Sequence, residues 1–193
     1  MKVLLLSPYP DGVVPAFGND QVTVGDAPLS VDMPAFVAAD FVVCYGYRHI
    51  IRPPVLAAKP GCIVNLHISY LPWNRGSDPN LWSVVQNTPA GITIHLVDQG
   101  VDTGPLLAQR RIEHEAGDTL ATSYWRLRHA IEALFVETWP AIRNGKIGPR
   151  AQEGTGTVHR SRDKEPLMAL LPGGWDTSLE EVRRIAIQHG FSE

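Results

Sequence analysis

Short apolar runs that end in turn-forming residues are the feature that most constrains the fold of this 193-residue chain. Uninterrupted runs of this length are typical of strands buried on both faces of a parallel sheet. We expect such strands at residues 2–6 and 41–45. Runs that also carry polar residues predict strands at 62–67 and 91–97, with 106–111 continuing the sheet, and a further β-like run lies at residues 21–24. Helical patterns separate several of them, and we expect helices within residues 50–58, 78–86, 119–145 and 178–189. Strands that alternate with helices predict an α/β fold with a mostly parallel sheet.

The charge and cysteine content disfavour several classes of protein. Seventeen Lys and Arg residues against 20 Asp and Glu give a formal net charge of −3, which disfavours a large nucleic-acid footprint. Cys44 and Cys62 lie in apolar runs with no second Cys or His at metal-ligand spacing, so we expect neither a disulfide scaffold nor a metal site. The apolar runs are too short for a signal peptide or a membrane helix. We therefore expect a soluble cytoplasmic protein with no membrane partner.

Polar side chains gather at the ends of two predicted strands. Asn65 and His67 alternate along one strand, so both face the same side of the sheet. His95 lies in the other strand, and the glycine-bounded loop after it carries Asp98 and Asp102. An amide donor beside an imidazole can stabilise an oxyanion and transfer a proton, and a loop carboxylate can orient the histidine. These residues favour acyl transfer to a nucleophile without a covalent enzyme intermediate.

The order of these residues resembles a known family. Asn-x-His-x-Ser-x-Leu-Pro at residues 65–72, Gly-x-Thr-x-His-x-Val at 91–97 and Asp-x-Gly at 102–104 are similar to the motifs of the folate-dependent formyltransferases. The family's proline between histidine and serine is Ile68 here. The resemblance implies a Rossmann-like, mostly parallel sheet flanked by helices in a single domain, with a catalytic domain at 1–150. We expect a C-terminal extension, residues 151–193, that packs on or near it.

The resemblance also implies roles for individual residues. Asn65 and His67 would stabilise the oxyanion formed when a primary amine attacks the formyl carbon of 10-formyltetrahydrofolate. Asp102 would hold His67 and help to remove the ammonium proton. The implied folate contacts are Tyr47, Arg48, His49, Ile50 and Ile51, with backbone around Val97, Asp98, Gln99, Gly100 and Val101.

Other residues near these motifs have two interpretations each. Ser69 either hydrogen-bonds the site or caps the turn, and Arg75 either binds a phosphate or carboxylate of the substrate or braces its loop through Asp78. We interpret His95 mainly as a packing residue. Trp73 directly follows the catalytic motif and is the preferred candidate for a substrate contact.

Two features that the sequence lacks reduce the range of possible acceptor amines. Residues 7–12 lack the glycine-rich phosphate loop of the purine-pathway enzymes, and the last 50 residues lack the basic character of a tRNA-binding domain. We expect a small-molecule amine, with a nucleotide-linked amino sugar first. Formylation of a free or carrier-bound amino acid and a non-catalytic folate-binding module stay open as alternatives, as does a homodimer.

Overall fold

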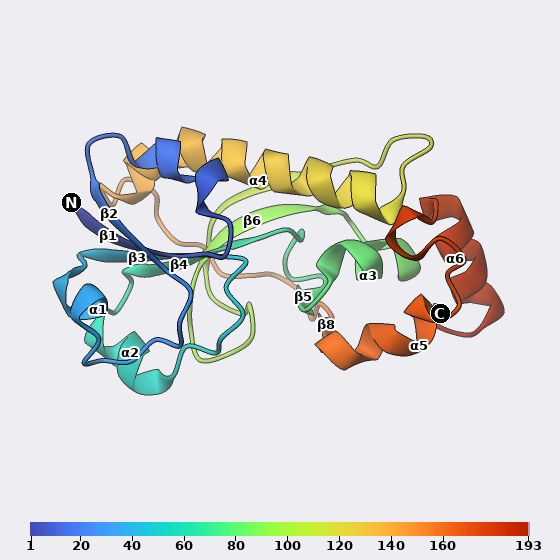
Figure 1. Ribbon diagram of the computed structural model, residues 1–193, viewed down its shortest axis with the longest axis horizontal. Helices are drawn as coiled ribbons and strands as arrows, with labels where there is room; N and C mark the ends of the chain where they lie inside the picture. The colour runs from blue at the N-terminus through green and yellow to red at the C-terminus, as the bar shows by residue number, and fades with distance from the viewer. Residues whose placement is uncertain (193) are drawn as a thin grey trace. The chain divides into compact units, whose positions relative to one another are not determined.

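Six strands form the main sheet of the computed structural model, which describes residues 1–192 (Figure 1). In their order across the sheet the strands are β2 (Gln21–Gly25), β1 (Lys2–Leu6), β3 (Phe41–Tyr45), β4 (Ile63–His67), β6 (Gly91–Leu96) and β7 (Leu106–Arg111). The neighbouring pairs from β2 to β4 are parallel. The predicted α/β fold with a mostly parallel sheet is therefore confirmed, because uninterrupted apolar runs do form its buried strands.

Strand β6 departs from the parallel arrangement, since it runs antiparallel to β4. The register pairs Asn65 with His95 and His67 with Thr93. Side chains at directly opposed positions of neighbouring strands lie on the same face of a sheet. The antiparallel pairing thus places Asn65 and His95 side by side on one face of the sheet.

Four helices of the described residues fall at or near the positions expected from the sequence, and two short ones, at residues 34–38 and 165–168, were not expected. The helices are α1 (Pro34–Ala38), α2 (Pro53–Ala58), α3 (Pro79–Val85), α4 (Leu120–Ile142), α5 (Glu165–Met168) and α6 (Leu179–Gln188), with 3-10 turns η1 (Pro10–Gly12), η2 (Val14–Phe17), η3 (Ser161–Lys164) and η4 (Gly174–Asp176). Strands β5 (Arg75–Gly76) and β8 (Val158–His159) form a second, parallel two-stranded sheet. Among the described residues, no helix has both the length and the apolar character needed to cross a membrane.

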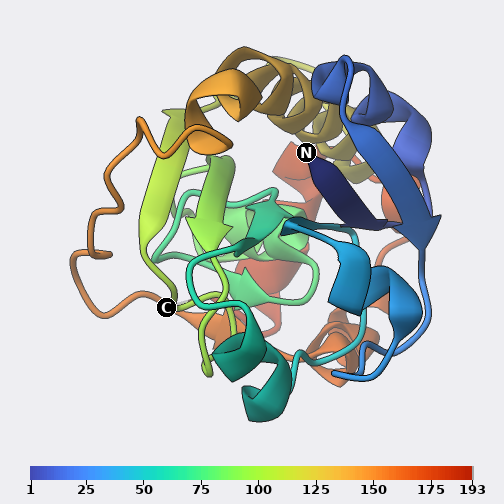
Figure 2. The same ribbon diagram turned by 90° about the vertical axis from the view of Figure 1, so that its left-hand side faces the viewer.

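The chain folds into two compact units, and the first contains residues 1–67, 93–108 and 131–152. Figures 1 and 2 show α1 and α2 on one face of β1, β3 and β4, and the C-terminal part of α4 on the other face. On the first face Phe36 of α1 and Val55 of α2 pack against Leu4 and Val42. On the second face the ring of Trp139 lies within 5.2 Å of the rings of both Phe17 and Phe41, centroid to centroid. Both faces are buried, as the unbroken apolar strands predict.

The second unit contains residues 68–92, 109–130 and the chain from 153 onward. Its core is formed by α3, α5 and α6, with apolar side chains such as Leu81, Leu167 and Val182 fully buried. The amphipathic pattern of α6 explains its place there, because its apolar residues recur every three to four positions. The predicted boundary at residue 150 stays a prediction.

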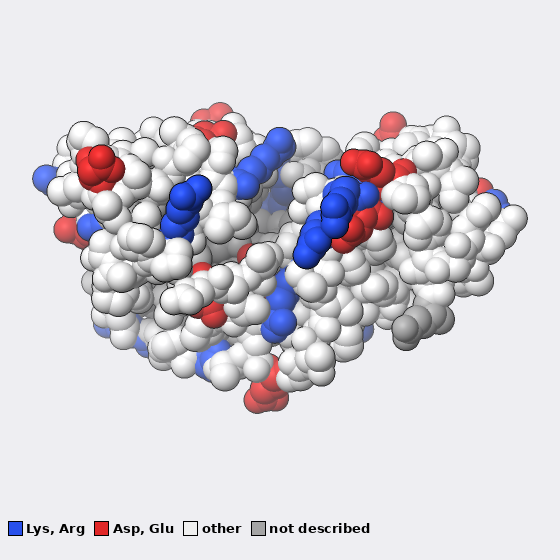
Figure 3. Space-filling model, turned by 90° about the horizontal axis from the view of Figure 1, so that it is seen from below, with Lys and Arg blue, Asp and Glu red and all other residues white. Residues whose placement is uncertain are grey.

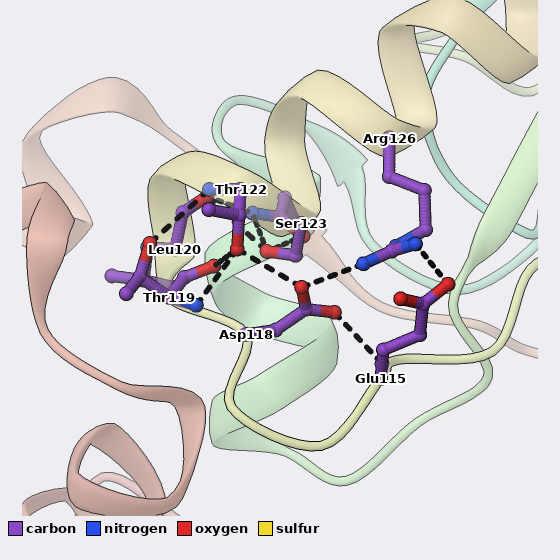
Figure 4. A network of polar contacts seen from close by, with 8 residues as sticks. Glu115, Asp118, Thr119, Leu120, Thr122, Ser123 and Arg126 are labelled. Carbon is purple, nitrogen blue, oxygen red and sulfur yellow. Dashed lines mark hydrogen bonds and ion pairs between the residues drawn. The ribbon is translucent and has the colours of Figure 1, made fainter.

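A polar network fixes the start of α4 within this second unit. Thr119 caps the helix, since its hydroxyl accepts the backbone N–H of Thr122 at 3.2 Å, as the sequence predicts. Asp118 accepts hydrogen bonds from the Thr122 hydroxyl (2.9 Å), the Glu115 N–H (2.7 Å) and the Arg126 guanidinium (2.7 Å). Figure 4 shows these side chains turned toward one another. Burial raises the pKa of the Asp118 carboxyl, but these hydrogen bonds and the Arg126 charge outweigh it and lower the pKa overall.

Candidate active site

Strand β4 presents Asn65 and His67 on one face of the sheet in the first unit. The neighbouring Val64 and Leu66 are buried, and alternation along the strand turns Asn65 and His67 to the opposite face from them. His67 is nearly buried, with 9% of its side chain exposed. A short apolar strand thus delivers two polar side chains to one side of a rigid sheet.

Asp102 meets both of these side chains from the loop between β6 and β7. Its Oδ1 accepts a hydrogen bond from Asn65 Nδ2 at 3.1 Å, and its Oδ2 lies 3.6 Å from His67 Nε2. The Asp102 side chain is 13% exposed, so this charge contact is only weakly screened by water. The structure therefore brings together the amide, imidazole and carboxylate that the sequence singles out, and their catalytic roles stay predictions.

The imidazole of His95 lies next to the Asn65 amide, on the neighbouring strand β6. Its Nδ1 is 2.8 Å from the carbonyl oxygen of Leu96, and because a carbonyl can only accept, Nδ1 must carry a hydrogen. Its Nε2 lies 3.3 Å from Asn65 Nδ2 and 3.4 Å from Asp102 Oδ1, and when the ring is neutral this nitrogen accepts from the amide. The two hydrogens of the amide are thus directed to His95 and Asp102, which fixes the orientation of the Asn65 side chain.

The loop that carries Asp102 is held tightly. Asp98 accepts hydrogen bonds from the Gly100 N–H (3.0 Å) and the Thr103 hydroxyl (2.6 Å), so it organises the loop. Asp102 itself has a φ of 51°, in the left-handed region that residues with a Cβ seldom adopt. Gly104 packs so closely that a Cβ there would lie 1.8 Å from the Leu96 carbonyl oxygen. This loop has little room to take another conformation.

The two loops implied to bind folate supply apolar groups to one cluster. Tyr47, Ile51 and Val97 all pack against the apolar face formed by α1, α2 and the sheet. The Tyr47 hydroxyl accepts the Leu29 N–H at 3.0 Å and donates to the Ala27 carbonyl at 2.9 Å. Burial raises the pKa of this phenol. The structure thus places the two loops implied to bind folate against the same apolar cluster, and their contact with folate stays a prediction.

The remaining predicted folate residues lie nearer to solvent. Arg48 and His49 are exposed, and the Ile50 side chain is 76% exposed, so Ile51 is the better-placed apolar wall of the two isoleucines. Gln99, Gly100 and Val101 form the exposed tip of the loop before Asp102. Their contribution to binding stays a prediction.

The predicted substrate contacts lie in the second unit. The Ser69 hydroxyl donates to the Trp73 carbonyl across a turn that contains a cis Leu71–Pro72 bond, which agrees with a turn-capping role for Ser69. Trp73 itself is partly exposed. Arg75 donates to the Thr155 carbonyl at 3.4 Å, and Asp78 pairs with Lys164 at 2.7 Å. Both charged residues of this loop therefore have structural partners in the C-terminal segment.

The buried cysteine of β3 fits chemistry without a covalent enzyme intermediate. Burial raises the pKa of the Cys44 thiol to about 12, so almost none of it is thiolate at neutral pH.

One residue that sequence reasoning missed is Gln152, whose side chain contacts the Asp102 loop. Nothing in its sequence neighbourhood distinguishes it, because the contact spans 50 residues of chain.

Comparison with solved structures shows the same fold along nearly the whole chain. A formyltransferase, PseJ from Anoxybacillus kamchatkensis, is 43% identical, with 96% of this chain and 100% of that chain covered and a TM-score of 0.90. That structure contains UDP-4,6-dideoxy-4-formamido-L-AltNAc and tetrahydrofolate. A sugar N-formyltransferase from a Shewanella species shares the fold at 18% identity, covering 96% of this chain and 87% of its own, with a TM-score of 0.78.

A third solved structure extends the likeness in fold. A 4-N formyltransferase from Francisella tularensis is 16% identical, covers 86% of this chain and 79% of its own, and has a TM-score of 0.78. The family model for formyl transferases matches residues 30–139, more than half of the chain, and this span includes Asn65, His67 and Asp102. This chain belongs to the formyl transferase family.

Proposed function

We propose that this enzyme transfers the formyl group of 10-formyltetrahydrofolate to the primary amine of a nucleotide-linked amino sugar. The observation that carries the proposal is the 43% identity, over 96% of the chain, to a formyltransferase whose structure holds a formylated UDP-sugar and tetrahydrofolate. The face shown in Figure 3, where basic and acidic side chains are interspersed with uncharged ones, agrees with a small-molecule acceptor.

The chemistry follows from the three side chains at the end of β4. A neutral amine attacks the formyl carbon, and the carbonyl oxygen becomes an oxyanion that His67 and Asn65 stabilise as hydrogen-bond donors. The Asp102 carboxylate, 3.6 Å from His67 Nε2, offsets the positive charge that develops on the imidazole or on the attacking nitrogen. It also helps to remove the ammonium proton, and the folate nitrogen takes up a proton as its bond to the formyl carbon breaks, so that tetrahydrofolate leaves as a neutral amine.

To stabilise the oxyanion, the Asn65 amide must exchange one of its present hydrogen-bond acceptors for the substrate oxygen. Its two hydrogens are directed to His95 and Asp102, at 3.3 and 3.1 Å from the amide nitrogen. To donate to the formyl oxygen, Asn65 has to release one of these contacts as the substrate oxygen arrives.

The chain also supplies the means to position the folate. Ile51 and Val97 offer apolar contacts to a flat ring, while the backbone of residues 97–102 offers N–H and carbonyl groups beside the reacting residues. Because Asp102 belongs to the same loop, the ring contacts and the catalytic carboxylate are placed by one piece of backbone.

A tetrahydrofolate-release assay across a panel of amines tests the proposal. With nucleotide amino sugars, amino acids and aminoacyl carriers offered at equal concentration, we expect the highest kcat/KM for a nucleotide amino sugar. Preferential formylation of an amino acid would contradict the proposed acceptor, and folate binding with no turnover of any amine would indicate a binding module. A cytoplasmic location and a homodimeric state are further predictions, which fractionation and light scattering would check.

A further inference from the structure

The side chain of Gln152 reaches the backbone of the loop that carries Asp102. Its Nε2 donates one hydrogen bond to the carbonyl oxygen of Asp102 at 2.8 Å and a second to that of Gly104 at 2.9 Å. A primary amide has two hydrogens on its nitrogen, so these two contacts account for both. One side chain therefore joins the carbonyls on either side of Thr103.

The segment that carries Gln152 is itself fixed to the start of β7. Leu106 and Arg150 exchange backbone hydrogen bonds of 2.7 and 3.0 Å. Gln152 follows Arg150 by two residues, so its backbone is anchored before its side chain crosses to the loop. Gln152, which follows Asp102 by 50 residues in the chain, thus braces the loop through its side chain.

The braced residue is the one whose backbone most needs support. Asp102 has a φ of 51°, and a residue with a Cβ keeps such a conformation only when its surroundings hold it. The direction of its carboxylate depends on that backbone, since the backbone dihedrals set where the side chain points toward Asn65 and His67.

We infer that Gln152 is a positioning residue for formyl transfer, which holds the Asp102 carboxylate in register with Asn65 and His67. This inference rests on the proposed function and on the proposed role of Asp102. Gln152 touches neither reacting group and acts through the loop. A displacement of about 1 Å in a catalytic group can cost up to about 100-fold in rate.

Gln152→Met tests the inference, because methionine keeps the length of the side chain and removes both donors. We expect kcat to fall about 10–100-fold while the KM values for folate and acceptor change less than about threefold. Gln86→Met is the matched control. Gln86 is also partly buried and also has a side-chain hydrogen bond, at 3.2 Å to His159, but it belongs to the second unit, whereas the Asp102 loop belongs to the first.

A double-mutant cycle separates positioning from general damage. If Gln152 acts through Asp102, the Gln152→Met change will alter the single-turnover rate less than about twofold in an Asp102→Asn background. An equal loss in both backgrounds, or wild-type kcat for Gln152→Met alone, would overturn the inference.

Amide hydrogen exchange gives a readout that does not depend on the acceptor. We expect residues 100–104 to exchange faster in Gln152→Met than in the wild type or Gln86→Met. Unchanged exchange would overturn the inference even if the enzyme is active. Absence of wild-type turnover with every acceptor would instead contradict the proposed function, and the exchange result would still decide whether Gln152 holds the loop.

Discussion

The direction of the Asn65 amide is determined by two neighbouring side chains, Asp102 and His95. Because His95 donates from Nδ1 to the Leu96 carbonyl, its Nε2 is left to accept from Asn65. The motif in the sequence marks His95 without saying which of its nitrogens would face Asn65. That assignment needs the antiparallel register of β4 and β6, which the apolar pattern does not contain.

Replacement of His95 tests this orientation. His95→Phe keeps a ring of similar size in a site that is 2% exposed, but it removes the acceptor for the Asn65 amide. We expect kcat to fall about 10–100-fold with little change in KM for folate, measured by steady-state kinetics. His189→Phe, at the end of α6, serves as the control. Wild-type kcat in His95→Phe would show that His95 only packs.

Gly46 is required by its conformation and by its neighbour. Its φ is +64°, and a Cβ there would lie 1.9 Å from the Tyr9 hydroxyl oxygen. We expect Gly46→Ala to lower the free energy of unfolding by about 1–3 kcal/mol, because the strain and the displaced ring add together. Urea unfolding measures this loss, with Gly25→Ala as a control in open space and without a positive φ. Equal stability of the two variants would contradict the close approach.

At the level of elements, the strands and the mostly parallel sheet were predictable, and the antiparallel direction of β6 was not. Apolar runs mark β1, β3, β4 and β6, because a strand buried on both faces has no polar position to interrupt it. The antiparallel direction of β6 depends on the path of the chain between α3 and β6, and no residue within the strand indicates that direction. The same limit applies to Gln152, whose bond to the Asp102 loop depends on where the chain leads after α4.

The start of α4 should give the protein a stability that depends on pH. The hydrogen bonds to Asp118 and the charge of Arg126 overcome burial and place its pKa below the ordinary value of 3.8. A carboxyl with a lowered folded-state pKa stabilises the protein above about pH 4, and this contribution is lost as the pH falls through the folded-state value.

Asp118→Asn tests that dependence. The amide keeps the size of the side chain but not its charge, so we expect a loss of about 1–2 kcal/mol at pH 7 and a smaller loss below pH 4. Urea unfolding between pH 2.5 and 7 measures both. A difference between variant and wild type that stays constant across this range would contradict the proposed origin of the stability.

For the whole molecule, the class of reaction was predictable and the acceptor less so. Asn65, His67 and Asp102 are marked by motifs whose order along the chain resembles that of a known family. The sequence leaves two interpretations of Arg75, substrate binding and bracing of its loop, and the contact of Arg75 with the Thr155 carbonyl agrees with bracing. The likeness to a formyltransferase with a bound UDP-sugar supports the proposed acceptor more directly than any residue does.

The most direct test compares formyl transfer from 10-formyltetrahydrofolate to a nucleotide-linked amino sugar by the wild type and by His67→Ala, with folate binding measured by calorimetry. The account predicts efficient transfer by the wild type and a kcat about 10²–10³-fold lower for His67→Ala, with folate affinity nearly unchanged. A variant that keeps wild-type kcat would contradict the role of His67. A wild-type protein that binds folate but formylates no nucleotide amino sugar would contradict the proposed reaction.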